Sequence, residues 1–211
     1  MQFAGAAGDD DEEGGEGGDG AKEDDEEEEE DMDPFDIMDP VDILDKLPKN
    51  FFELVEEKKW QLRKEALDAL LPLSKSPKIA SNADYGDLVR VFKKFIGKDT
   101  NVMLVSLAAQ CLAGVARGLR TAFKNGASQC LPTVLEKLKE KKVTVVAALT
   151  DALDALYPCM GIEAVQEDTL GSLKHKTPGV VAETAKFLGK VPFCLVLCLF
   201  VWILYFLFWR A

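Results

Sequence analysis

Residues 97–112 read GKDTNVMLVSLAAQCL, a short polar and charged stretch followed at once by a run rich in Val, Leu and Ala. Within this run the apolar residues recur every three or four positions, at Val102, Val105, Ala108, Ala109 and Leu112. That spacing places them on one face of an α-helix. The polar stretch before them has the composition of a turn. The segment therefore predicts a turn that leads into an amphipathic helix.

The same arrangement occurs three more times along the chain. A basic segment leads into an apolar helical face in KKWQLRKEALDAL (58–70), KEKKVTVVAALTDAL (139–153) and KHKTPGVVAETAKFL (174–188). The four segments start about 35 to 42 residues apart, which is the spacing of HEAT-type helix pairs. No alternating strand pattern interrupts them. The sequence therefore predicts an all-α protein, a short HEAT-repeat α-solenoid in which stacked helix pairs bury a common core.

Turn signals between the apolar runs set the expected limits of each pair. We expect helix pairs at about 50–74, 84–118, 127–156 and 161–190. Near the helix starts lie polar side chains that can accept hydrogen bonds from free backbone N–H groups, namely Asp84, Asp99, Thr100 and Thr177. These residues are the predicted helix caps.

In such a stack the turn inside each pair emerges on the same edge, so residues about 40 apart in sequence become neighbours. The residues expected on this edge are Lys58, Lys59, Trp60, Lys98, Asp99, Thr100, Asn101, Val102, Lys139, Lys141, Lys142, Lys174, His175 and Lys176. A lysine-rich edge with one tryptophan suits an acidic protein partner, because charge speeds the encounter and an aromatic side chain contributes binding energy. The alternative is that the lysines are solvated and Trp60 packs between helices.

Four segments closely resemble the second TOG domain of the Mini spindles / ch-TOG family of microtubule polymerases. They are DPVDILDKLPKNFFELVEEKKWQLRKEALDAL, YGDLVRVFKKFIGKDTNVMLVSLAAQCLAGVARGL, LPTVLEKLKEKKVTVVAALTDALDALY and KTPGVVAETAKFL. The resemblance extends from Asp39 to Lys190, about 150 residues. It implies a rigid, paddle-shaped stack whose intra-repeat loops grip the tubulin heterodimer. The chain would hold about four of the family's six repeats.

The resemblance also implies which residues contact tubulin. The first loop supplies Trp60 with Lys59 beside it, and the second supplies Lys98 with Thr100, Asn101 and Val102 at its tip. The third matches less closely: it keeps Lys141 and Lys142, but Val143 stands where the family usually has proline. The fourth supplies Lys176. The family's remaining repeats reach α-tubulin, so this fragment is expected to contact mainly the β subunit, more weakly than a complete domain and without polymerase activity alone.

Two further segments differ sharply in composition from the helical region. Residues 1–33 carry 17 Asp and Glu against one Lys, and almost nothing that could be buried, which predicts a disordered acidic linker. Residues 191–211 form a hydrophobic tail with 17 uncharged residues from Phe193 to Trp209. As a helix these would span about 25 Å, short of a hydrocarbon core of roughly 30 Å. A translated intron and a membrane tail anchor both remain open. The helical domain is accordingly expected at 34–190.

The sequence lacks the residues that several classes of function require. With one histidine, no CxxC pair, no nucleophile elbow and a failed phosphate-loop match at GKDT, we expect no enzyme activity, metal or cofactor. Nucleic-acid binding is disfavoured because the lysine row lacks interleaved arginines and aromatics.

The expected function is tubulin binding within a plus-end polymerase, in the cytoplasm and on microtubules, including the spindle, centrosome and kinetochore. The alternatives are a tail-anchored HEAT-repeat adaptor, which would contact a membrane only if the tail is genuine, and a HEAT module for another acidic partner.

Overall fold

The structure is a computed structural model that describes residues 33–160 and 162–190, with the side chains of 162–164 excepted. The predicted disorder of the acidic segment concerns residues of which only Asp33 is described, and both interpretations of the tail fall outside the described residues. Within the described part the chain is helical, apart from loops, turns and one isolated β-bridge between Val41 and Ile79.

The helices follow the predicted pairs closely. In chain order they are α1 (Pro34–Ile37), α2 (Phe51–Leu54), α3 (Trp60–Ser74), α4 (Gly86–Lys98), α5 (Val102–Leu119), the 3-10 turn η1 (Arg120–Phe123), α6 (Lys124–Lys137), α7 (Val143–Leu156), η2 (Tyr157–Cys159), α8 (Ile162–Leu173) and α9 (Pro178–Lys190). The pairs are α2–α3, α4–α5, α6–α7 and α8–α9. The first helix of the first pair is only four residues long, because the charged residues after Val55 offer no further apolar face.

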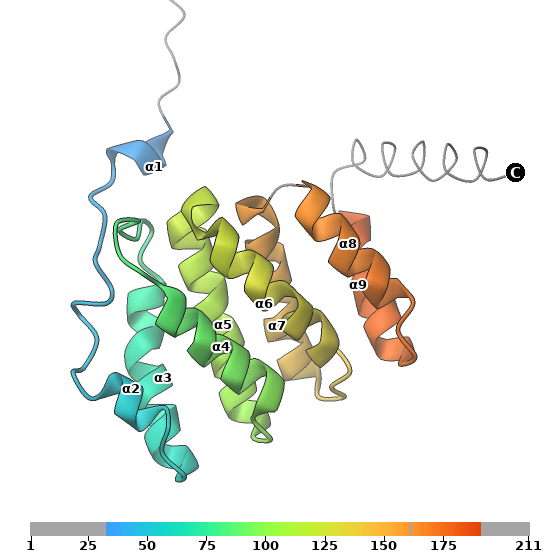
Figure 1. Cartoon of the computed structure of the whole chain (residues 1–211), viewed down its shortest axis with the longest axis horizontal. Coiled ribbons are helices and arrows are strands. Elements are labelled where there is room, and N and C mark those ends of the chain that lie inside the picture. The colour runs from blue at the N-terminus through green and yellow to red at the C-terminus, as the bar shows by residue number, and fades with distance from the viewer. Residues whose placement is uncertain (1–32, 161, 191–211) are drawn as a thin grey trace, which may run out of the picture. The chain divides into compact units, whose positions relative to one another are not determined.

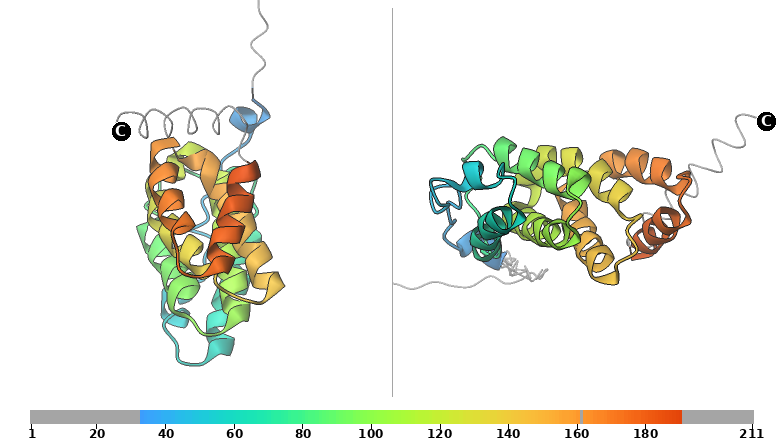
Figure 2. Two further views of the ribbon diagram at one scale, coloured as in Figure 1. Left: turned by 90° about the vertical axis from the view of Figure 1, so that its right-hand side faces the viewer. Right: turned by 90° about the horizontal axis from the view of Figure 1, so that it is seen from below.

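The described helices pack in two layers. The first helices of the pairs, α2, α4, α6 and α8, lie in one layer, and the second helices, α3, α5, α7 and α9, lie in the other (Figures 1 and 2). Along the second layer α5 packs against both α3 and α7, while α4 covers it from the first layer and α6 packs against α4 and α7. This stacking of successive pairs confirms the predicted all-α solenoid.

The core is centred on α5. Eleven of its eighteen residues are buried, which leaves only a narrow exposed strip. For this reason the helical stretch Val102–Lys137 is long and apolar enough to cross a membrane by length and composition, yet 67% of its most apolar window is buried inside the fold. Core helices of folded domains commonly combine these properties.

The residues before α2 contact the turns that join successive helix pairs. Val41 accepts a hydrogen bond from Ala80 N and donates one to Lys78 O, both 3.0 Å long. Nearer the N-terminus, the guanidinium of Arg120 lies 3.8 Å from the centre of the Phe35 ring. Arg120 also pairs with Asp33 and is the one described non-glycine residue with a positive φ, 48°. These contacts lie at the turns between pairs, away from the loops within each pair.

Candidate functional site

The four loops that join the helices within each pair emerge along one edge of the described domain. They span residues 55–59, 99–101, 138–142 and 174–177, and we refer to them together as the loop edge. In Figure 1 all four turn at the lower edge of the helices, although they lie about 40 residues apart in the sequence. The predicted site residues Lys59, Trp60, Lys98, Thr100, Asn101, Val102, Lys141, Lys142 and Lys176 all lie on this edge or in the first helical turn beyond it.

Trp60 is the first residue of α3 and does not belong to the core. Its side chain is 41% exposed, whereas Ala66, Leu67 and Leu70 on the buried face of the same helix are at most 1% exposed. Lys59 precedes it in an extended conformation and is exposed. The alternative, that the Trp60 side chain is buried between helices, does not agree with this exposure. The loop edge therefore presents a large aromatic surface to solvent.

The second loop is held by two successive side-chain turns. Asp99 Oδ1 accepts a hydrogen bond of 2.8 Å from Asn101 N, and Asn101 Oδ1 accepts one of 3.0 Å from Met103 N. Asn101, and neither Asp99 nor Thr100, is therefore the N-cap of α5, which corrects the sequence prediction. A β-region backbone and a short side-chain oxygen at that position suit a cap. Thr100 and Lys98 are exposed, and Val102 is half-buried.

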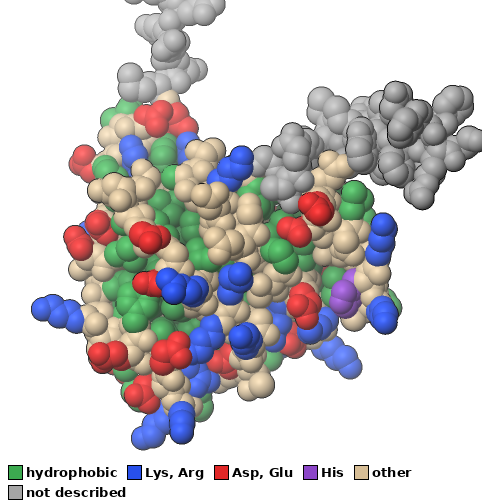
Figure 3. Space-filling model, viewed as in Figure 1, with side chains coloured by type: hydrophobic (Ala, Val, Ile, Leu, Met, Phe, Trp, Pro, Cys, Tyr) green, Lys and Arg blue, Asp and Glu red, His purple; other side chains and the backbone are tan. Residues whose placement is uncertain are grey.

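The third and fourth loops contribute mainly charged side chains to the loop edge. Lys141, Lys142 and Lys176 are all exposed. Lys139 donates a 3.0 Å hydrogen bond to Glu136, which lowers the pKa of that carboxyl from its ordinary value. Figure 3 shows Lys and Arg side chains gathering along the lower edge of this face, with acidic side chains among them. The edge as a whole combines exposed cations with apolar side chains.

Two apolar residues of the loop edge were not among the predicted contacts. Met103, the second residue of α5, is 49% exposed, and Val143, the first residue of α7, is 79% exposed. Each occupies nearly the same helical position as Trp60 in its own pair. The start of each of the helices α3, α5 and α7 thus offers an apolar side chain to solvent. A repeat-by-repeat alignment of these starts was the signal that could have identified them.

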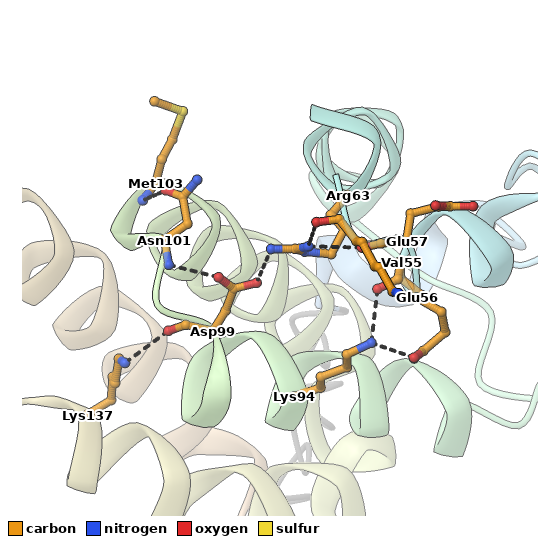
Figure 4. A network of polar contacts seen from close by, with 10 residues as sticks. Val55, Glu56, Glu57, Arg63, Lys94, Asp99, Asn101, Met103 and Lys137 are labelled. Atoms are coloured by element: carbon orange, nitrogen blue, oxygen red, sulfur yellow. Dashed lines mark hydrogen bonds and ion pairs between the residues drawn. The ribbon is translucent and has the colours of Figure 1, made fainter. Parts of the chain in front are cut away.

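A set of internal ion pairs joins the loops to one another (Figure 4). Arg63, one turn into α3, donates from Nη1 to the carbonyl oxygens of Glu57 and Lys58, each at 2.9 Å. Its Nη2 lies 3.0 Å from Asp99 Oδ2, and the two side chains are only 17% and 10% exposed. One guanidinium therefore contacts both the first and the second loop.

Two lysines extend this set of contacts. Lys94 of α4 donates to Val55 O at 3.1 Å and pairs with Glu56 at 2.6 Å. Lys137 of α6 donates to Asp99 O at 3.4 Å and pairs with Glu140 of the third loop at 3.2 Å. Arg63, Lys94 and Lys137 were not predicted from the sequence, because single cations on amphipathic helices look like solvated surface residues. Asp99 was expected on this edge and as a helix cap, but not as the partner of an arginine.

The aspartates in the groove beside the third loop are engaged in ion pairs. The groove beside the third loop, about 650 Å³ between α7 and α9, contains Asp151 and Asp154. Both are ion-paired, with Arg117 and Lys190 respectively. Among the described side chains, no three His, Cys, Asp or Glu come together in a way that could hold a metal ion.

Comparisons with known proteins agree with the described fold. Protein mini spindles of Drosophila melanogaster is 50% identical over 160 residues, 76% of this chain and 8% of that protein. Zygote defective protein 9 of Caenorhabditis elegans is 42% identical over 159 residues, 75% of this chain and 11% of that protein. No family model matches the chain.

Solved structures that share the fold include the two described next. One, from work on microtubule plus-end tracking by XMAP215, CLIP-170 and EB1, is 52% identical with a TM-score of 0.69, over 72% of this chain and 63% of that one. The chain belongs to the Mini spindles / ch-TOG family. A TOG-domain array structure from work on tubulin recruitment by microtubule polymerases is 39% identical with a TM-score of 0.70, over 74% of this chain and 32% of that one. The TOG domain described here thus spans about a tenth of the length of these two curated relatives.

Proposed function

We propose that the loop edge of this TOG domain binds the tubulin heterodimer, mainly through its β subunit, with Trp60 as the central contact. The observation that carries the proposal is the position of Trp60: an aromatic residue that starts a core helix, yet lies 41% exposed beside a row of lysine-bearing loops. Tryptophan is enriched among the few residues that contribute most of the binding energy of protein interfaces. The tubulin recruitment described for a 39% identical TOG-domain array supports the same assignment.

The side chains of the loop edge contribute to binding in two ways, through apolar surface area and through positive charge. Trp60 and the exposed apolar residues Met103 and Val143 supply area that is removed from water on binding. The contacts of the second loop are made by Lys98, Thr100, Asn101 and Val102. The basic contacts of the third and fourth loops are made by Lys141, Lys142 and Lys176. Lysines of this kind attract an acidic partner and orient its approach.

We further propose that the domain acts by binding and not by catalysis, as one module of a microtubule polymerase that works at plus ends and on the spindle. The groove between α7 and α9 does not favour a catalytic alternative, because Asp151 and Asp154 are already ion-paired. The same proposal includes two further points. The domain corresponds to the second TOG domain of the family, and its limits are residues 34–190.

The test is the substitution Trp60→Ala. We expect tubulin affinity to fall about 30-fold to 1000-fold, equivalent to about 2–4 kcal/mol, because a central interface tryptophan is removed. Co-elution with tubulin in size-exclusion chromatography should disappear, while the helical circular dichroism stays unchanged. Isothermal titration gives the affinity where binding is still measurable.

Phe52→Ala is the matched control. Phe52 is 43% exposed, almost as much as Trp60, but it lies on the face between α2 and α4 and not on the loop edge. We expect this variant to bind tubulin as the unmodified chain does. The proposal is wrong if Trp60→Ala unfolds the domain and spares binding, or if both variants weaken binding equally.

A further inference from the structure

The fourth loop of the loop edge ends in a threonine followed directly by a proline. Pro178 is the first residue of α9, and the carbonyl oxygen of Thr177 accepts a hydrogen bond of 3.1 Å from Val180 N. Thr177 N donates to His175 Nδ1 at 3.1 Å. These bonds use the backbone of Thr177 and leave its hydroxyl group out. Thr177 is half-buried, and Lys176 and Pro178 on either side of it are exposed.

A serine or threonine followed by proline is the sequence that proline-directed protein kinases select. The active sites of these kinases leave the backbone N–H of the following residue without an acceptor, and proline has no N–H group to leave unpaired. The sequence contains two such steps, Ser76 before Pro77 and Thr177 before Pro178. The first follows α3 in the turn between two helix pairs, and the second lies on the loop edge.

The backbone after Ser76 is tied to distant parts of the chain. Ile79 N donates to Gly118 O at 2.9 Å, and Lys78 O accepts from Val41 N at 3.0 Å. Kinases bind the residues around the modified side chain in an extended conformation. For Ser76 to adopt it, these bonds would break and the buried side chain of Ile79 would be exposed.

The backbone after Thr177 is held by local bonds, to His175 and within the first turn of α9. Of residues 178–181 only Val180 is buried. A terminal helical turn with one buried side chain opens at a lower free energy than a segment bonded to distant strands and helices. Thr177 is therefore the more accessible of the two threonine–proline and serine–proline steps.

We propose that Thr177 is a phosphorylation site for a proline-directed protein kinase, and that the phosphate weakens partner binding at the loop edge. The kinase transfers the γ-phosphoryl group of ATP to Thr177 Oγ1. The bond between the γ-phosphorus and its bridging oxygen breaks, ADP leaves, and the hydroxyl proton passes to the catalytic carboxylate of the kinase. The effect on binding rests on the proposed function of the loop edge.

The product places a strong negative charge in a basic loop. A phosphothreonine carries about −1.5 to −2 charges at pH 7, which offsets the exposed cations Lys174 and Lys176. The phosphate also lies at the positive end of the α9 helix dipole, which stabilises it there. An acidic partner is attracted to the fourth loop of the unmodified chain and is repelled from it after modification.

The first measurement needs no tubulin. The full chain is incubated with ATP and, in parallel, with one purified cyclin-dependent kinase and one purified mitogen-activated protein kinase, and the phosphate is located by peptide mass spectrometry. We expect Thr177 to be modified at least about tenfold faster than Ser76, because the fold restrains the residues after Ser76. Pro178→Ala keeps the hydroxyl group and should slow the modification about tenfold.

Synthetic peptides of residues 70–83 and 171–184 are the matched control. Outside the fold both steps are extended and accessible, so both peptides should be modified at similar rates. The phosphorylation site is refuted if neither kinase modifies Thr177 in the folded chain, or if Thr177 is modified no faster than Ser76 there. Neither result depends on whether the chain binds tubulin.

The second measurement compares tubulin association of the unmodified and the phosphorylated chain by stopped-flow kinetics. We expect association to slow about tenfold at low salt after phosphorylation, and the difference to shrink as salt is added. Thr177→Val keeps the side-chain volume without the hydroxyl group. This variant should associate like the unmodified chain both before and after kinase treatment.

The outcomes separate the two proposals. If the chain phosphorylated at Thr177 associates with tubulin as fast as the unmodified chain, the proposed effect of the phosphate is wrong. If kinase treatment slows the Thr177→Val variant equally, the effect belongs to another residue and the assignment to Thr177 is wrong. If the unmodified chain does not bind tubulin at all, the proposed function fails, and the kinase measurement by itself decides whether Thr177 is a phosphorylation site.

Discussion

At the scale of single residues, the three described cysteines are packed as apolar groups. Burial raises the pKa of Cys111 and of Cys130 to about 12 and that of Cys159 to about 11. Cys159 Sγ also lies 3.3 Å from the carbonyl oxygen of Ala116 in the neighbouring helix. All three thiols are free. Their surroundings disfavour the thiolate, which is the reactive form.

This environment predicts that the three thiols resist alkylation in the folded chain. At pH 8 a thiol with a pKa of 11 to 12 is ionised to only about 0.01–0.1%, so reaction with iodoacetamide should be very slow. Peptide mass spectrometry should find Cys111, Cys130 and Cys159 labelled at under about 1% of their rate in urea. Rapid labelling of Cys159 in the native chain would contradict the described packing.

The same scale shows which site residues the sequence could predict. Trp60 is conspicuous as a tryptophan among charged residues, but that pattern left packing between helices open, and only the family resemblance placed it among the contacts; its exposure agrees with a place on the surface. Arg63 was not predicted, because its contacts are to Asp99, 36 positions away, and to two backbone carbonyls. Sequence periodicity indicates which face a residue occupies, but not which distant polar group it meets.

At the scale of elements, α3 and α5 approach each other closely at a glycine. A Cβ atom on Gly114 of α5 would lie 2.5 Å from the carbonyl oxygen of Ser74, at the end of α3. Ordinary contacts require about another ångström, and the obstacle is backbone, which cannot swing away. The close packing of the first two pairs therefore depends on the missing side chain at this position.

Gly114→Ala is accordingly expected to destabilise the domain by about 1–3 kcal/mol, because overpacking outweighs the gain in helix propensity of about 1 kcal/mol. Gly171→Ala in α8 is the control: nothing lies within 4 Å of the position that its added methyl group would take, so the same substitution should stabilise by about 0.5–1 kcal/mol. Urea unfolding followed by circular dichroism measures both. Midpoints that shift in the same direction would refute the packing argument.

Element limits were predictable to within a few residues where the apolar period is strong. The expected pair 84–118 corresponds to α4 and α5, which run from Gly86 to Leu119. The sequence prediction named Asp99 and Thr100 as caps at the start of α5, because aspartate, threonine and asparagine can all cap a helix, and only the backbone geometry at Asn101 decides among them. Local chemistry thus allowed more than one residue to cap α5, and the folded loop shows that Asn101 does so.

At the scale of the whole chain, charge is divided very unevenly. The chain carries a net charge of −12, of which residues 1–33 contribute −16 and the remainder +4. The mild positive charge of the helical region is not spread evenly either, since exposed lysines gather at the loop edge (Figure 3). If the loop edge binds tubulin as proposed, the rate of association should depend on which lysines are present and not on their total number.

Replacing Lys141 and Lys142 together by alanine should therefore slow association with tubulin several-fold at low salt, with little change in dissociation, because exposed charges steer the encounter. Added salt should remove the difference, since screening shortens electrostatic reach to about 10 Å at 0.1 M. The loss caused by Trp60→Ala should persist at all salt concentrations. Stopped-flow kinetics separates the two rates.

The control for this prediction removes the same charge from the other side of the helices. Lys75, just after α3, and Lys124, the first residue of α6, are exposed beside the turns between successive pairs, so Lys75→Ala with Lys124→Ala lowers the net charge equally without touching the loop edge. If steering is local, this variant associates with tubulin almost as fast as the unmodified chain. If both double variants slow association to the same extent, only net charge matters, and the loop edge has no special part in guiding tubulin to Trp60.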